Sequence, residues 1–153
     1  FILEPWNESK KRKAVSSAKF YFFDIGVANY LNGRKVINRN SDDFGEAFEH
    51  WVAMELRAYL SYKRIKEPLT YWRTTSKEEV DFIIGNRVAI EVKATTKVIE
   101  KHLKSLKRLS QEGIIQSLFL VSFDEIERKT SDGIRTIYWK NFINDLWCGK
   151  IIA

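Results

Sequence analysis

Cysteine and histidine are scarce in this chain of 153 residues. The single cysteine, Cys148, excludes an internal disulfide framework and a cysteine-rich zinc site. The two histidines, His50 and His102, are too few for most metal sites built from imidazoles. The simplest expectation from this composition is a reduced, cytoplasmic setting.

Long apolar runs and several familiar catalytic signatures are also missing. No stretch approaches the roughly 18 apolar residues of a membrane span. No positively charged leader with a short apolar region opens the chain, so secretion is not indicated. The sequence lacks a glycine-rich phosphate loop, a G-x-S-x-G motif and an H-E-x-x-H motif. It starts at Phe1 rather than at a methionine, and we expect it to be part of a longer protein.

The chain does contain enough apolar material for one packed domain. Hydrophobic residues make up 44% and aromatic residues 14% of the sequence, which suffices for a core. Charged residues make up 30%, and the formal net charge is +6. A positive excess favours acidic partners, with nucleic acid first among them, although an excess of this size is also common on proteins without such a partner.

Two aromatic-rich runs near the start of the chain predict a hairpin. They span residues 1–6 and 18–23, and the polar, basic segment between them is typical of a long loop. Four basic residues of this segment would either contact phosphates or stay solvated: Lys10, Lys11, Arg12 and Lys13. Asp24 then predicts a short helix that ends at Asn32-Gly33. Residues 1–40 are therefore expected to form an N-terminal unit.

A second unit, residues 41–153, is predicted to be α/β, with a mixed sheet flanked by helices. Ser41 and the two aspartates after it supply capping oxygens for a long helix over 43–63. The elements expected after it are strands at 69–74, 79–85 and 87–95, a helix at 98–111, a buried strand at 114–123, a strand at 134–139 and a helix at 141–147.

Three charged residues, Asp81, Glu91 and Lys93, stand in the otherwise apolar second and third of these strands. Alternation puts Glu91 and Lys93 on one face, and Val80 and Phe82 on the face opposite Asp81. A two-residue turn at Gly85-Asn86 would pair the strands as a hairpin and bring Asp81 close to Glu91. Bare charges between apolar neighbours are costly to bury, so the three side chains are expected to share a site.

Two carboxylates on one sheet face suit a hard cation such as Mg²⁺ or Mn²⁺, and the Val92 carbonyl would complete the ligand set. The metal would lower the pKa of a bound water and polarise a phosphate oxygen. Lys93 would orient that water or neutralise the charge of the transition state. In the competing interpretation, Asp81 pairs with Lys93 on a charged strand face at a sheet edge.

The long helix offers two candidates for a third ligand. Glu55 falls near the centre of its apolar arc, and Glu49 falls toward one edge of that arc. A carboxylate on a buried face needs a metal, a cation or backbone donors as its partner. Each glutamate would therefore join the metal site or form a structural ion pair.

The order helix, three strands, helix, strand, with Asp81 and Glu91-Val92-Lys93, resembles the PD-(D/E)XK nuclease superfamily, which includes restriction endonucleases and Holliday-junction resolvases. The chain also resembles, over nearly its whole length, the C-terminal domain of unknown function of many bacterial and archaeal AAA-type ATPases. The strings that carry this likeness are KFYFFDIGVANYL (19–31), GEAFEHWVAMEL (45–56), YWRT (71–74), EVDFII (79–84) and AIEVKAT (89–95).

The resemblance implies metal ligation by Asp81 and Glu91, a catalytic role for Lys93, and a helix acid at Glu49 with Glu55 as the other choice. It also implies an N-terminal ATPase domain, with residues 1–40 as the end of a winged-helix segment. Two functions follow as expectations. One is a Mg²⁺-dependent nuclease that hydrolyses DNA, and the other is a non-catalytic module of the ATPase that binds nucleic acid or protein.

Overall fold

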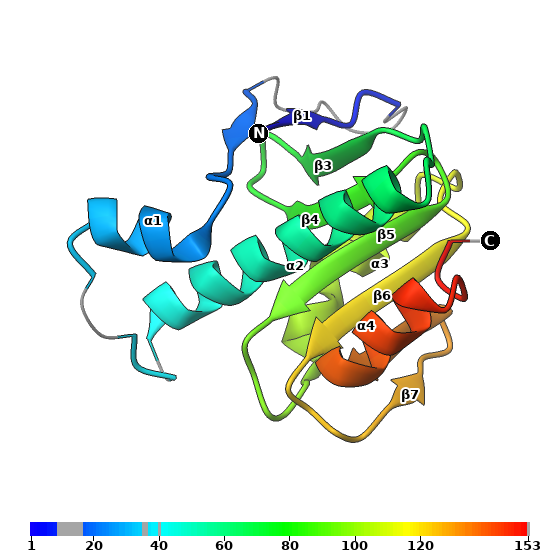
Figure 1. Cartoon of the computed structure of the whole chain (residues 1–153). Helices are drawn as coiled ribbons and strands as arrows, with labels where there is room; N and C mark the ends of the chain where they lie inside the picture. The colour runs from blue at the N-terminus through cyan, green and yellow to red at the C-terminus, as the bar shows by residue number, and fades with distance from the viewer. Residues whose placement is uncertain (9–16, 35–36, 40, 153) are drawn as a thin grey trace.

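Four α-helices and one eight-stranded mixed sheet form the part of the chain described by the computed structural model, residues 1–8, 17–34, 37–39 and 41–152 (Figure 1). The predicted α/β class with a mixed sheet is thus confirmed. The strand order is β2-β1-β3-β4-β5-β6-β8-β7. None of the helices in these ranges is long and apolar enough to cross a membrane.

The strands are β1 (Ile2–Pro5), β2 (Lys19–Phe20), β3 (Leu69–Arg73), β4 (Glu79–Ile84), β5 (Val88–Lys93), β6 (Ser117–Ser122), β7 (Arg128–Lys129) and β8 (Ile134–Tyr138). The helices are α1 (Ile25–Leu31), α2 (Asp42–Tyr62), α3 (Lys104–Ser110) and α4 (Trp139–Trp147), and the short 3₁₀ helix η1 (Glu100–Leu103) leads into α3. Strands β3, β4 and β5 are antiparallel, whereas β5, β6 and β8 are parallel.

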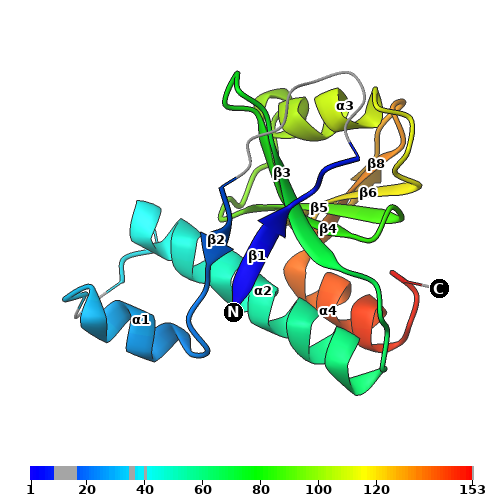
Figure 2. The same ribbon diagram turned by 90° about the horizontal axis from the view of Figure 1, so that it is seen from above.

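Helices α2 and α4 cover one face of the sheet and α3 covers the other, as Figure 2 shows. The larger core lies under α2 and α4 and includes Leu56 and Phe82. The smaller core lies under α3 and includes Trp72 and Leu106. Strand β5 contributes to both cores, so a charged residue on it is enclosed unless it lies at the end of the strand.

The predicted N-terminal hairpin is present and extends the main sheet. Strands β1 and β2 pair in antiparallel fashion, with Leu3 opposite Lys19. Strand β1 also pairs in parallel with β3. The Asp24 carboxylate accepts a hydrogen bond from the Val27 amide at 2.9 Å and starts α1, as predicted. The basic cluster expected at residues 10–13 lies outside the described residues.

Two details of the chain after β5 differ from the prediction. The helix expected over 98–111 starts later, because the Val98 amide donates to the Asp124 carboxylate at 2.8 Å and Val98 therefore stays outside the helix. Strand β7 was not predicted, since two exposed residues give no alternation to detect. The long helix α2 was predicted to within one residue at each end, and the Ser41 hydroxyl caps it by accepting from the Phe44 amide at 3.3 Å.

The turn between β4 and β5 has three residues rather than the two predicted. Ile84 is opposite Val88, and Phe82 is opposite Ile90. One step further along this register, Asp81 lies opposite Glu91. A two-residue turn would have put Asp81 opposite Ile90 instead, and the Asp81 and Glu91 side chains would then have pointed to opposite faces of the sheet. The predicted closeness of Asp81 and Glu91 therefore depends on the extra turn residue.

The pairing of β3 with β4 contains a β-bulge that includes Asp81. Thr70 is opposite Ile83 and Trp72 is opposite Val80, so that Asp81 and Phe82 together lie opposite Tyr71. The bulge turns Val80 into the smaller core, while Phe82 stays in the larger one. The prediction that Val80 and Phe82 share a face was therefore wrong. Bulges commonly re-aim a side chain next to a functional site.

Candidate functional site

Asp81 and Glu91 form the buried centre of the candidate site, with only 5% and 3% of their surfaces exposed. The Asp81 Oδ2 atom accepts a hydrogen bond of 2.8 Å from the Val92 amide. This contact lies just beyond the last paired residues of the β4–β5 ladder, so the carboxylate takes the place of a backbone carbonyl. Asp81 is thereby fixed between the two strands.

Glu91 has one occupied and one unsatisfied carboxylate oxygen. Its Oε1 atom lies 2.6 Å from the Lys93 Nζ atom. Its Oε2 atom is buried and has no hydrogen-bond partner in the described part of the chain. A buried acceptor without a partner is unfavourable, and such atoms often mark a site where an ion or water binds.

The charge states of this centre are shifted by burial and by the neighbouring acids. Burial raises the pKa of Asp81 well above its usual range, and Glu91 and Glu49 raise it further. Burial also raises the pKa of Glu91 to about 7, although Lys93 opposes this change. Burial disfavours the charged form of Lys93, but Glu91 and Asp81 outweigh it and raise the pKa of the ammonium. Perturbed groups gathered in this way are typical of functional sites.

We expect the stability of the metal-free protein to fall as pH rises from about 4.5 to about 7. In this interval Glu91 keeps its proton in the folded protein, where its pKa is about 7, but loses it in the unfolded chain, where the value is 4.5. The folded state then binds more protons, so stability decreases with rising pH, by roughly 3 kcal/mol from this residue. The raised pKa of Asp81 acts in the same direction.

Urea unfolding in EDTA across this pH range measures the effect. The charged groups that face Glu91 are Lys93, Glu49, Glu79 and Asp81, so the comparison must isolate one of them. The Glu91→Gln variant serves this purpose, because it removes the titrating proton and keeps the shape of the side chain. Its stability should fall less over the interval, and an equal fall in both proteins would contradict the assignment.

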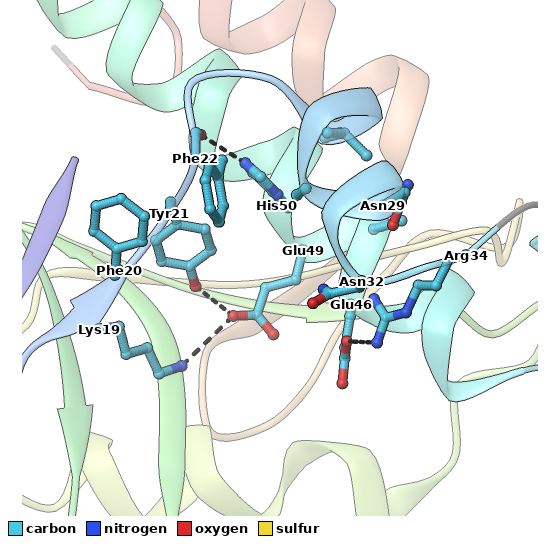
Figure 3. A pocket seen from close by; sticks show the side chains of 13 residues that line it. Lys19, Phe20, Tyr21, Phe22, Asn29, Asn32, Arg34, Glu46, Glu49 and His50 are labelled. Atoms are coloured by element: carbon cyan, nitrogen blue, oxygen red, sulfur yellow. Dashed lines mark hydrogen bonds and ion pairs between the residues drawn. The ribbon is translucent and has the colours of Figure 1, made fainter.

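Glu49 reaches the site from α2 and is held by two residues of the N-terminal segment (Figure 3). Its Oε1 atom accepts a hydrogen bond of 2.5 Å from the Tyr21 hydroxyl and lies 3.5 Å from the Lys19 Nζ atom. Lys19 also pairs with Glu79 of β4. Lys19 and Tyr21 were not predicted as site residues. The alternation of Lys-Phe-Tyr-Phe, which puts them on one strand face, was the available signal.

The residues described so far form what we call the acid cluster: Asp81, Glu91 and Glu49 with their partners Lys93, Lys19 and Tyr21. The structure does not bring Glu55 to this cluster. Its Oε2 atom accepts a hydrogen bond of 3.0 Å from the Trp147 Nε1 atom of α4. Glu55 follows Glu49 by six residues, which is about 9 Å along the helix axis and a different helix face. Glu49 is therefore the helix acid that accompanies Asp81 and Glu91.

The competing interpretation, with Asp81 paired to Lys93 at a sheet edge, does not describe this arrangement. Lys93 pairs with Glu91 instead. Strands β4 and β5 lie inside the sheet, with β3 beyond one and β6 beyond the other. Asp81 and Glu91 are thus enclosed by neighbouring strands rather than displayed on an edge, whereas the Lys93 side chain, at the end of β5, is 39% exposed.

A pocket of about 410 Å³ lies beside the cluster, between β2, α1 and α2 (Figure 3). Lys19, Tyr21 and Glu49 belong to both the pocket wall and the cluster. Its other lining residues are Phe20, Phe22, Ile25, Ala28, Asn29, Asn32, Arg34, Glu46, Ala47 and His50. A molecule in this pocket would therefore contact the site through Glu49.

The donor set fits a hard divalent cation held by two carboxylates. The described ranges contain no group of three or more His, Cys, Asp or Glu side chains placed to hold a metal ion. Mg²⁺ commonly keeps several waters and takes only one or two protein carboxylates. The unsatisfied Oε2 atom of Glu91 and the raised pKa values of Asp81 and Glu91 are consistent with that mode, because a bound cation would replace protons.

Together, fold and site define a mixed α/β domain with a buried carboxylate–lysine cluster at the bulged end of a β-hairpin. The chain belongs to the family described as "Domain of unknown function (DUF4143)", which matches residues 44–142. No curated protein and no solved structure matches the chain. Glu49, Asp81, Glu91 and Lys93 lie within the matched residues, whereas Lys19 precedes them.

Proposed function

We propose that this domain is a metal-dependent nuclease that hydrolyses phosphodiester bonds of DNA on a PD-(D/E)XK-type core. The observation that carries the proposal is the buried pair Asp81 and Glu91, with an unsatisfied carboxylate oxygen on Glu91 and the Lys93 ammonium beside it. A protein that needed these residues only for stability would gain more from apolar side chains in the same places.

The order of elements supports the same core. Helix α2, strands β3, β4 and β5, helix α3 and strand β6 follow one another in the sequence expected from the resemblance. Asp81 comes from β4, whereas Glu91 and Lys93 come from β5. The domain would work inside a longer chain that carries an N-terminal AAA-type ATPase domain.

Each residue has a role that its surroundings favour. Asp81 and Glu91 would hold Mg²⁺ or Mn²⁺, and Glu49 would add negative charge from α2. When bound, the metal supplies an acidified water and a polarised phosphate oxygen. Lys93 stays charged at neutral pH because Glu91 and Asp81 raise its pKa, so it can orient the attacking water and stabilise the anionic transition state.

We expect the Glu91→Gln variant to lose at least a hundredfold in the rate of Mg²⁺-dependent DNA cleavage, because a neutral amide holds the cation poorly. The measurement is a single-turnover assay on labelled single- and double-stranded DNA, with EDTA as the metal-free reference. Glu55→Gln is the matched control, since Glu55 lies on another face of α2, where it accepts a hydrogen bond from Trp147 of α4. Equal cleavage by the wild type and Glu91→Gln would remove the assigned site.

A non-catalytic module of the ATPase is the second candidate, and the ion pairs of the cluster favour it. Lys93 already pairs with Glu91, and Lys19 pairs with both Glu49 and Glu79. In such a module these pairs would be structural, and the domain would bind nucleic acid or a protein. Thermal unfolding with and without Mg²⁺ or Mn²⁺ separates the two candidates, because only a metal site predicts a higher unfolding temperature with the cation.

A further inference from the structure

The pocket beside the acid cluster combines aromatic walls with uncharged polar groups. Phe20 and Phe22 contact each other edge to face, with ring centroids 5.2 Å apart, and Phe20 is 66% exposed. The His50 ring forms another part of the wall and is held in place by a 2.8 Å hydrogen bond with the Phe22 carbonyl oxygen. An exposed aromatic ring next to an open pocket offers a face for stacking.

Two carboxamides line the opposite side, on α1 and at its end. Figure 3 marks no hydrogen bond between the side chain of Asn29 or Asn32 and the other lining residues that it draws. A carboxamide provides both donors and an acceptor, which is the pattern that the edge of a nucleobase requires. The pocket can therefore supply stacking and hydrogen bonds to the same flat, polar ring.

The charges of the pocket cancel one another. Lys19 pairs with Glu49, and Arg34 lies 2.6 Å from Glu46. Two cations and two carboxylates leave no net charge to attract a phosphate into the pocket itself. The uncharged part of a nucleotide fits this lining better than its phosphate does. The phosphate would lie toward the acid cluster, on the side of Glu49, where a cation held by Asp81 and Glu91 would offset the negative charge of the carboxylates.

We propose that the pocket between β2, α1 and α2 binds one unpaired nucleobase of single-stranded DNA, next to the phosphodiester at the acid cluster. The inference rests on the proposed function and specifies its substrate as single-stranded at this position. A base inside a duplex has its faces stacked and its edge paired, so only a base outside the stack can enter a walled pocket.

Fluorescence anisotropy of a short fluorescein-labelled single-stranded oligodeoxynucleotide tests the proposal in EDTA, where cleavage does not interfere. The variants are Phe20→Ala and Asn29→Ala. Tyr30→Ala is the matched control, because Tyr30 is an 82% exposed aromatic residue of α1 that does not line the pocket. We expect Phe20→Ala to weaken binding about tenfold, in line with the loss of one stacked base. Asn29→Ala should weaken it severalfold, and Tyr30→Ala should bind like the wild type.

Three results would overturn the inference: no binding by the wild type, equal binding of the oligonucleotide and its duplex, or equal effects of Phe20→Ala and Tyr30→Ala. The cleavage assay separates this failure from that of the nuclease proposal. If Glu91→Gln abolishes cleavage while Phe20→Ala binds normally, only the base subsite is wrong. If the pocket variants lose binding while Glu91→Gln cleaves normally, the subsite stands and the catalytic assignment falls.

Discussion

Replacing Asp81 with asparagine is expected to lower the rate of Mg²⁺-dependent DNA cleavage at least a hundredfold without destabilising the fold. The amide keeps an oxygen that can accept the Val92 hydrogen bond, but it lacks the charge that a metal requires. It also avoids the cost of burying an anion near Glu91 and Glu49. The stability of Asp81→Asn in EDTA at pH 8 should therefore equal that of the wild type or exceed it by about 1–2 kcal/mol.

Asp124 provides the control for this prediction because it is also a buried aspartate, but its pKa is lowered, whereas the pKa of Asp81 is raised. Burial opposes its charge, but hydrogen bonds from the Val98 and Ile126 amides lower its pKa. Asp124→Asn should lose about 1–3 kcal/mol of stability and keep its cleavage rate when folded. The assignment of Asp81 would be contradicted if Asp81→Asn were the destabilised variant and still cleaved DNA.

Replacing Trp72 with alanine is expected to cost about 3–5 kcal/mol in the free energy of unfolding. Trp72 is fully buried in the core between the sheet and α3, where it lies in the β3 segment next to the bulge. A protein of this size has limited stability to lose, so a large fraction of Trp72→Ala should be unfolded in mild denaturant. Urea titration followed by circular dichroism measures the change.

Trp72→Phe distinguishes packing from hydrogen bonding at the same position. The Trp72 Nε1 atom is buried without a partner among the described residues, so its removal breaks no hydrogen bond. Phenylalanine should therefore cost much less than alanine. Similar losses for both variants would mean that an interaction of the indole nitrogen, rather than ring volume, stabilises this position.

The sequence was sufficient for most of the elements and for the expectation that Asp81 and Glu91 lie close together, but not for the register of the strands that carry them. Hydrophobic periodicity predicted α2 and the three strands after it, because each has one strongly apolar face. Turn length and bulges depend on backbone geometry that composition specifies only weakly. The three-residue turn and the bulge at Asp81 were both missed for this reason, although together they determine where Asp81 points.

The contribution of Lys19 and Tyr21 to the site could not be predicted from the sequence either. Lys19 and Tyr21 lie about thirty residues before Glu49, and nothing in the spacing says that an edge strand folds back onto α2. The choice between Glu49 and Glu55 was open for a related reason. Both are half-buried residues of α2, and only the packing of α4 assigns Glu55 to Trp147.

Glu49 is held by Lys19 of β2 and by Tyr21 just after this strand, so part of the site depends on the outermost strand of the sheet. A two-residue strand at an edge has few hydrogen bonds, so it can open locally while the rest of the domain stays folded. Opening would remove the Tyr21 hydroxyl and the Lys19 ammonium from Glu49 and leave the cluster more negative. The affinity of the cluster for a cation would then rise whenever this strand detaches, which links the charge of the site to the fraying of one edge.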